Sequence, residues 1–66
     1  MVNNLHHIHL PEGMDIEGGV TRSKTLYVDL EHEGTLVSLL TDHPEMLEKV
    51  RFACEVALRE WDKLYG

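Results

Sequence analysis

The end of the chain, from Thr41 to Gly66, carries the strongest structural signal, because its apolar residues recur at helical spacing. At 100° per residue, most of them fall on one stripe: Leu47, Val50, Cys54, Ala57, Leu58, Trp61, Leu64 and Tyr65, with Met46 and Ala53 at its edge. The pattern predicts one long helix over residues 43–65. We expect this stripe to be the face that packs on the rest of the protein.

Residues at both ends of this segment are typical of helix termini. Asp42 can accept hydrogen bonds from the first backbone N–H groups, and Glu45, three positions later, completes a capping box. Pro44 lies in the first turn, where its missing donor does no harm, and Gly66 is a suitable residue to end the helix. We therefore expect Asp42 to be the N-cap.

The middle of the chain, residues 24–41, predicts a β-hairpin. Its first half alternates apolar and polar residues, and Glu33-Gly34 supplies a turn. A two-residue loop pairs Leu30 with Val37 and Val28 with Leu39, so that all four face the helix. A slip of one residue would exchange the two faces of the sheet.

The N-terminal part gives a weaker signal. The segment NLHHIHL, residues 4–10, can form a short strand with Ile8 and Leu10 inward and His7 and His9 outward. The following PEGMDIEGG reads as a loop because of its Pro and Gly content. The predicted fold is a single α+β domain over 1–66, in which a hairpin, or three strands with the N-terminal one, packs on a long C-terminal helix. Residues 1–20 are either flexible or an edge strand plus loop.

Charge and cysteine content restrict the class of protein. Twelve acidic residues stand against six basic ones, which argues against direct binding to nucleic acid. Residues 1–43 carry a net charge of minus five and residues 44–66 only minus one. Cys54 is the only cysteine, so no disulfide forms within the chain, and no segment resembles a signal peptide or membrane helix. We expect a soluble, unprocessed cytoplasmic protein.

Sequence motifs for catalysis, cofactors and metals are weak. Gly18-Gly19 lacks the Lys and Ser/Thr of a phosphate-binding loop, and no nucleophile motif surrounds a serine or Cys54, so we expect neither an enzyme nor a cofactor. His7 and His9 would project to one side of a strand, and His32 could join them around a metal ion. A zinc site needs three or four protein ligands, however, and Cys54 reads as a small buried thiol.

Two surfaces have apolar residues where solvent is expected. Phe52 lies roughly 200° from Val50 around the helix, and Val56 lies about 40° from Phe52. On the outer face of the predicted sheet, apolar residues mix with polar ones: Tyr27, Leu36 and Leu40 with Asp29, Glu31 and Ser38. These are either ordinary exposed residues or surfaces that a second copy or another protein covers, as expected of a domain too small to bury them alone.

The function hypothesis that follows is a small acidic protein–protein interaction module, homodimeric, that acts as an inhibitor, adaptor or regulatory subunit. Its candidate partner-binding residues are Phe52, Val56, Tyr27, Asp29, Glu31, Leu36 and Leu40. Asp29, Glu31 and Glu33, together with the acids of the N-terminal loop, can also imitate the phosphate spacing of nucleic acid, and small acidic inhibitors from phages have this general composition. One alternative is a metal or small-ligand binder that uses the histidines. Another is a structural subunit of a larger assembly.

Overall fold

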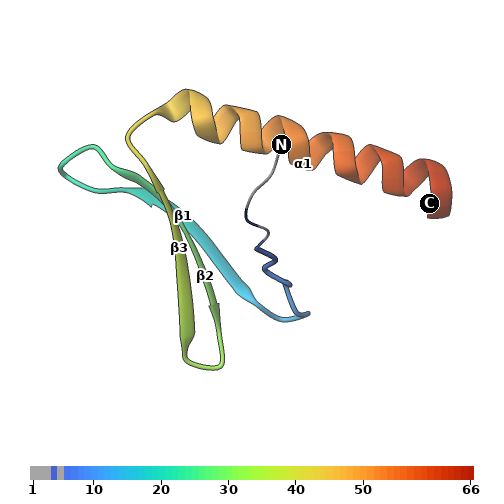
Figure 1. The fold of residues 1–66 in the computed structure, drawn as a ribbon, viewed down its shortest axis with the longest axis horizontal. Helices are drawn as coiled ribbons and strands as arrows, with labels where there is room; N and C mark the ends of the chain where they lie inside the picture. The colour runs from blue at the N-terminus through green and yellow to red at the C-terminus, as the bar shows by residue number, and fades with distance from the viewer. Residues whose placement is uncertain (1–3, 5) are drawn as a thin grey trace.

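The computed structural model describes residue 4 and residues 6–66, and it confirms the α+β class (Figure 1). Three antiparallel strands, β1 (Asp15–Val20), β2 (Leu26–His32) and β3 (Thr35–Thr41), precede one long helix, α1 (Pro44–Tyr65). The strands lie in the order β1-β2-β3, so β2 is central. Within the described residues, no helix has the length and apolar character needed to cross a membrane.

The predicted hairpin register is confirmed. Leu30 pairs with Val37 and Val28 with Leu39 across β2 and β3. The turn residues Glu33 and Gly34 have φ angles of 48° and 82°. Positive φ at both central residues is the mark of a type I′ turn, whose twist matches that of the flanking strands and so fixes a two-residue loop.

The first strand does not lie where the sequence predicted it. The segment 4–10 forms no strand at its described residues, and Leu5 lies outside them. Instead β1 begins at Asp15, inside the segment expected to be a loop. Gly18 and Gly19 are poor strand formers, but Gly19 lies opposite Tyr27, whose ring occupies the space a side chain at position 19 would need. The aromatic ring of Tyr27, on β2, thus covers the backbone of β1 at Gly19.

The helix begins one residue later than the predicted cap implied. His43 is the N-cap, it makes no capping side-chain hydrogen bond, and Pro44 is the first helical residue. The Oδ1 atom of Asp42 instead accepts a hydrogen bond of 2.8 Å from the Thr25 hydroxyl in the loop between β1 and β2. Asp42 therefore ties that loop to the start of α1 rather than capping the helix. At the other end, Gly66 caps α1 as expected, through its N–H to the Asp62 carbonyl.

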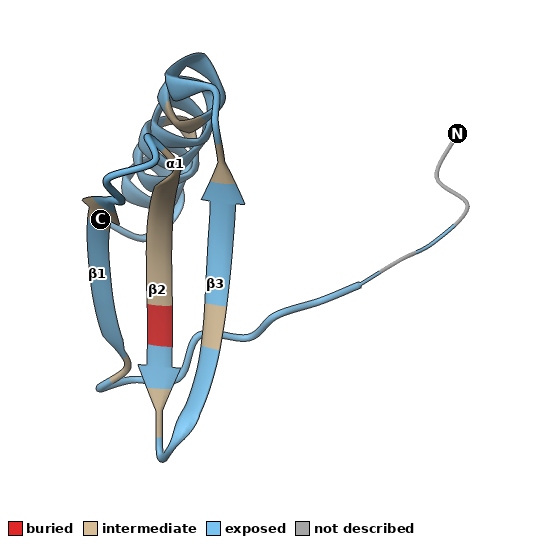
Figure 2. Cartoon of the chain, turned by 90° about the vertical axis from the view of Figure 1, so that its left-hand side faces the viewer, coloured by how far each residue is buried: buried red, intermediate tan, exposed pale blue. Residues whose placement is uncertain are grey.

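The strand register gives the sheet two chemically different faces. One side, which we call the inner face, has Ile16, Gly18, Val20, Leu26, Val28, Leu30, His32, Thr35, Val37, Leu39 and Thr41. The outer face has Asp15, Glu17, Gly19, Tyr27, Asp29, Glu31, Leu36, Ser38 and Leu40. Figure 2 views the sheet from its outer side, with α1 and the segment before β1 behind it. Leu30, at the centre of the inner face, is 7% exposed and is the one buried hydrophobic residue among the described residues.

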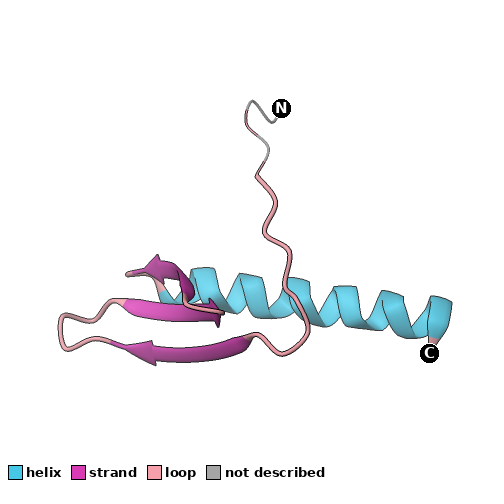
Figure 3. Ribbon diagram, turned by 90° about the horizontal axis from the view of Figure 1, so that it is seen from below, coloured by secondary structure: helices cyan, strands magenta, loops and turns pink. Residues whose placement is uncertain are grey.

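Helix α1 packs on the sheet only near its own start. Its main contact is with β3, where Leu39, Leu40, Thr41, Met46, Leu47 and Val50 line a hollow. Beyond this junction the helix leaves the sheet, as seen from below in Figure 3. The expectation that the whole apolar stripe faces the sheet is therefore wrong: Leu47 is half-buried, but Cys54 and Trp61 are exposed.

The resulting molecule is extended for its size. Its radius of gyration is 14.2 Å, whereas a compact domain of this length has a value of about 11 Å. A helix of 22 residues, about 33 Å long, projects from a small sheet and contributes to this difference. The chain therefore leaves exposed much of the apolar surface that the sequence pattern predicts to be buried.

Candidate acidic docking surface

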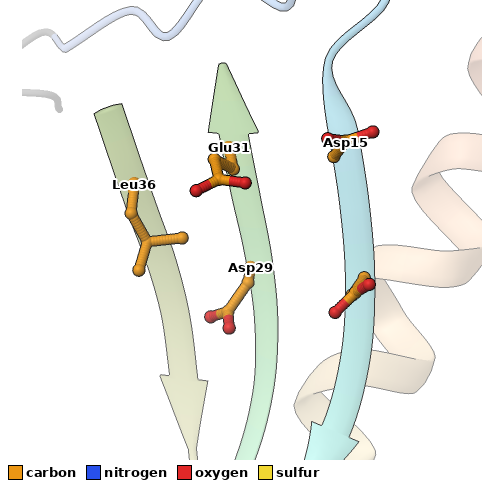
Figure 4. Close-up of a pocket in the computed structure, with 5 residues that line it drawn as sticks. Asp15, Asp29, Glu31 and Leu36 are labelled. Atoms are coloured by element: carbon orange, nitrogen blue, oxygen red, sulfur yellow. The ribbon is translucent and has the colours of Figure 1, made fainter. Parts of the chain in front are cut away.

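Four carboxylates lie together on the outer face of β1 and β2 (Figure 4). Asp15 is directly opposite Glu31, and Glu17 is directly opposite Asp29. With Leu36 of β3, they line one hollow. We call Asp15, Glu17, Asp29 and Glu31 the acidic cluster. The strand alternation produces it, because D-I-E in β1 and D-L-E in β2 each place two acids on the same side.

The acidic cluster opposes the stability of the sheet. Residues directly opposite in an antiparallel pair have Cβ atoms about 4.5–5.5 Å apart, and like charges there are destabilising. None of the ion pairs in the described part of the chain involves these four residues. Asp29 is half-buried and accepts a hydrogen bond of 2.7 Å from the Ser38 hydroxyl, which fixes its carboxylate across β2 and β3. The cluster is thus partly oriented but carries no compensating positive charge.

The average charge density of the cluster along the strand axis resembles that of a nucleic-acid strand. Acids two apart on a strand are separated by about 6.8 Å, so the two rows together supply about one negative charge per 3.4 Å of strand axis. One strand of double-stranded DNA also carries a charge about every 3.4 Å of helix axis. A protein surface built to bind phosphates could therefore meet a similar charge density here.

The predicted partner-binding residues divide into three groups. Asp29, Glu31 and Leu36 meet in the hollow of the acidic cluster. Tyr27 and Leu40 share the outer face, but Tyr27 is half-buried over Gly19, and Leu40 lies at the junction with the helix.

Phe52 and Val56 are on α1, on the side opposite its apolar stripe, and so lie apart from the cluster. Phe52 is 62% exposed, while Val56 is half-buried.

Two cluster residues were expected elsewhere. The sequence predicts a loop for Asp15 and Glu17, because Pro11, Gly13 and the paired glycines dominate that segment. The period-two alternation of Asp15, Ile16 and Glu17 is the signal that could have placed both acids on one face of a strand. Glu33, predicted to join them, is in the hairpin turn, with its Oε1 atom 3.8 Å from Nε2 of His32 on the inner face.

The histidines do not form a complete metal site. The rings of His7 and His9 have centroids 6.2 Å apart, and His9 lines a hollow with His32 on the inner side of the sheet. No group of three or more His, Cys, Asp or Glu residues within residues 4 and 6–66 is arranged to hold a metal ion. Metal binding stays a hypothesis that a zinc titration of the protein, against a His7→Ala, His9→Ala variant, would test.

The outer face therefore presents an acidic hollow, whereas the inner face and the apolar stripe of the helix present surfaces without Asp, Glu, Lys or Arg. No family model, curated protein or solved structure matches this chain.

Proposed function

We propose that this chain is an acidic protein–protein interaction module that works as a homodimer and docks its outer sheet face on a basic surface of another protein. The observation that carries the proposal is that carboxylates stand directly opposite each other across β1 and β2, Asp15 opposite Glu31 and Glu17 opposite Asp29. Proteins tolerate such local tension mainly at functional sites. A partner that supplies Lys or Arg side chains would relieve it.

An inhibitor is the form of this function that the geometry favours. The acidic cluster has about the linear charge density of one DNA strand, and it is presented on two paired strands of the sheet. Occupying a basic nucleic-acid-binding groove would exclude the natural ligand from it. Leu36, which is exposed beside the cluster, adds an apolar contact that phosphates cannot make.

A displacement assay tests the proposal directly. Basic DNA- and RNA-binding proteins are each loaded with a fluorescent oligonucleotide, and the purified chain is titrated in. The expected result is displacement from at least one of them, with an affinity that falls steeply as salt increases, because opposing charges are screened. Failure to displace the oligonucleotide from any of these proteins would contradict the proposal that the chain acts as an inhibitor of this kind.

A matched pair of variants separates the cluster from net charge. The cluster variant combines Asp15→Asn, Glu17→Gln, Asp29→Asn and Glu31→Gln. The control variant removes four charges elsewhere: Glu12→Gln, Glu45→Gln, Glu55→Gln and Asp62→Asn. We expect the cluster variant to bind at least about tenfold more weakly, which is a loss of about 1.4 kcal/mol, and the control to bind nearly as well as the native chain. Equal losses in both would show that only total charge matters.

A further inference from the structure

The inner face of the sheet is built for contact with apolar groups. None of its eleven positions is Asp, Glu, Lys or Arg, whereas the outer face has four carboxylates. The segment before β1 covers this face from the hairpin end to its centre, since Ile8 and Met14 line a hollow with His32 and Thr35 at that end and with Leu30 at the centre. Towards β1 and the helix the face stays open: Ile16 is 55% exposed and Val20 is 64% exposed.

The second half of α1 has a matching surface without a partner in its own chain. Leu58, Trp61 and Leu64 lie on one stripe and are 61–70% exposed. Trp61 and Tyr65 pack against each other, with ring centroids 4.7 Å apart, which forms a broad aromatic end to the stripe. Because α1 diverges from the sheet (Figure 1), this end cannot reach the inner face of its own chain.

The accessible surface in excess of that of a compact monomer is about what one chain buries in a homodimer interface. The accessible surface is 6280 Å², whereas a compact monomer of 7.6 kDa exposes about 4,300 Å². Two chains that each removed the excess would bury about 4,000 Å², which is within the range of obligate homodimer interfaces. Even if the segment before β1 accounts for half of the excess, about 2,000 Å² is left for the interface, the lower end of that range.

We propose that a second copy of this chain covers both surfaces, with the second half of each α1 lying on the inner sheet face of the other chain. This rests on the homodimer in the proposed function and specifies its interface. A two-fold axis lets each chain offer one helix and receive one, so the assembly closes at two copies. The outer faces, with their acidic clusters, then point away from the interface and stay free for a basic partner.

Three single variants locate the interface in sedimentation equilibrium. Val20→Asp on the sheet and Leu58→Asp on the helix each place a carboxylate in the apolar contact, so each should raise the dimer dissociation constant at least about 100-fold. Phe52→Asp, on the opposite side of the same helix, is the matched control and should leave a dimer. Far-UV circular dichroism of each variant, at concentrations where the native chain is dissociated, shows whether the sheet is retained.

A measurement on the native chain does not depend on variants that fold poorly. In a dimer mixed from isotope-labelled and unlabelled chains, filtered nuclear Overhauser spectra select contacts between copies. We expect contacts from the Trp61 indole to methyl groups of Ile16, Val20 or Leu39. Contacts between helices alone, or a monomer produced by Phe52→Asp, would overturn this interface but leave the homodimer. A monomer at all concentrations would exclude both the homodimer and this interface. The docking of the acidic cluster on a basic partner is tested separately, by the displacement assay.

Discussion

Among the residues that the structure describes, two other than glycine have left-handed backbone conformations, and both are in the connections between strands. Lys24 has a φ angle of 69° and Glu33 one of 48°. In each case the side chain crowds the backbone, at a cost of roughly 1–2 kcal/mol relative to a right-handed conformation. Lys24 is held by hydrogen bonds within its loop, including its N–H to the Thr21 carbonyl at 3.0 Å. Glu33 is held by the two-residue turn itself.

Replacing Glu33 should therefore stabilise the hairpin. Asn tolerates positive φ and is preferred before glycine in type I′ turns, so Glu33→Asn should raise the free energy of unfolding by about 1 kcal/mol. Urea denaturation measures it. Glu33→Gln is the control, because it removes the same charge without favouring the left-handed conformation. An equal gain in both variants would mean that charge, not backbone strain, limits stability at this turn.

In the acidic cluster, by contrast, we expect a surface carboxylate to lower the stability of the sheet. Glu17→Gln removes the like charge that stands directly opposite Asp29, and it should increase the free energy of unfolding by about 0.2–1 kcal/mol at low salt. The gain should shrink in concentrated salt, where the repulsion is screened. Glu55→Gln, on the exposed side of α1, is the control. No difference between the two variants would contradict the tension on which the proposed function rests.

At the level of secondary structure elements, the hairpin and the helix were predictable because their signals are local. Alternation, a Glu-Gly turn and a 3.6-residue period act within a few neighbours along the chain. Strand β1 was not, since Gly18 and Gly19 weaken any local strand signal. What compensates for Gly19 is the ring of Tyr27, eight residues later and on the neighbouring strand. Strand β1 thus depends on a tertiary contact that local propensity cannot express.

The start of α1 can be improved, since its N-cap is a histidine without a capping hydrogen bond. His43 has extended backbone angles that suit a capping residue, and its own N–H is already bonded to the Thr41 hydroxyl at 3.1 Å. His43→Ser should place a side-chain oxygen near the free N–H groups of the first turn and add about 1 kcal/mol to stability. Thermal unfolding by circular dichroism measures the gain. His43→Ala should give none, and a similar rise for Ala would exclude capping as the cause.

At the level of the whole molecule, the sequence predicted which side of the helix is apolar but not what covers it. An amphipathic period indicates that burial of the apolar stripe is favourable. It does not indicate whether the sheet of the same chain or a second chain buries that stripe. The sequence predicts that the sheet covers the stripe and that a second copy or another protein covers Phe52. The structure leaves the stripe itself exposed beyond Val50, which moves the expected contact between copies to the other side of the helix.

A dimer whose chains complete each other's core should become more stable as its concentration rises. Tenfold more protein favours the folded dimer by about 1.4 kcal/mol per two chains, so the unfolding midpoint should rise by roughly 3 to 6 °C. Trp61 is the only tryptophan and reports the same event, since its emission should shift to shorter wavelengths as the indole leaves water. Leu58→Asp should abolish both concentration dependences. A midpoint and emission that are the same across a hundredfold dilution of the native chain would mean that one chain is stable with its helix in solvent.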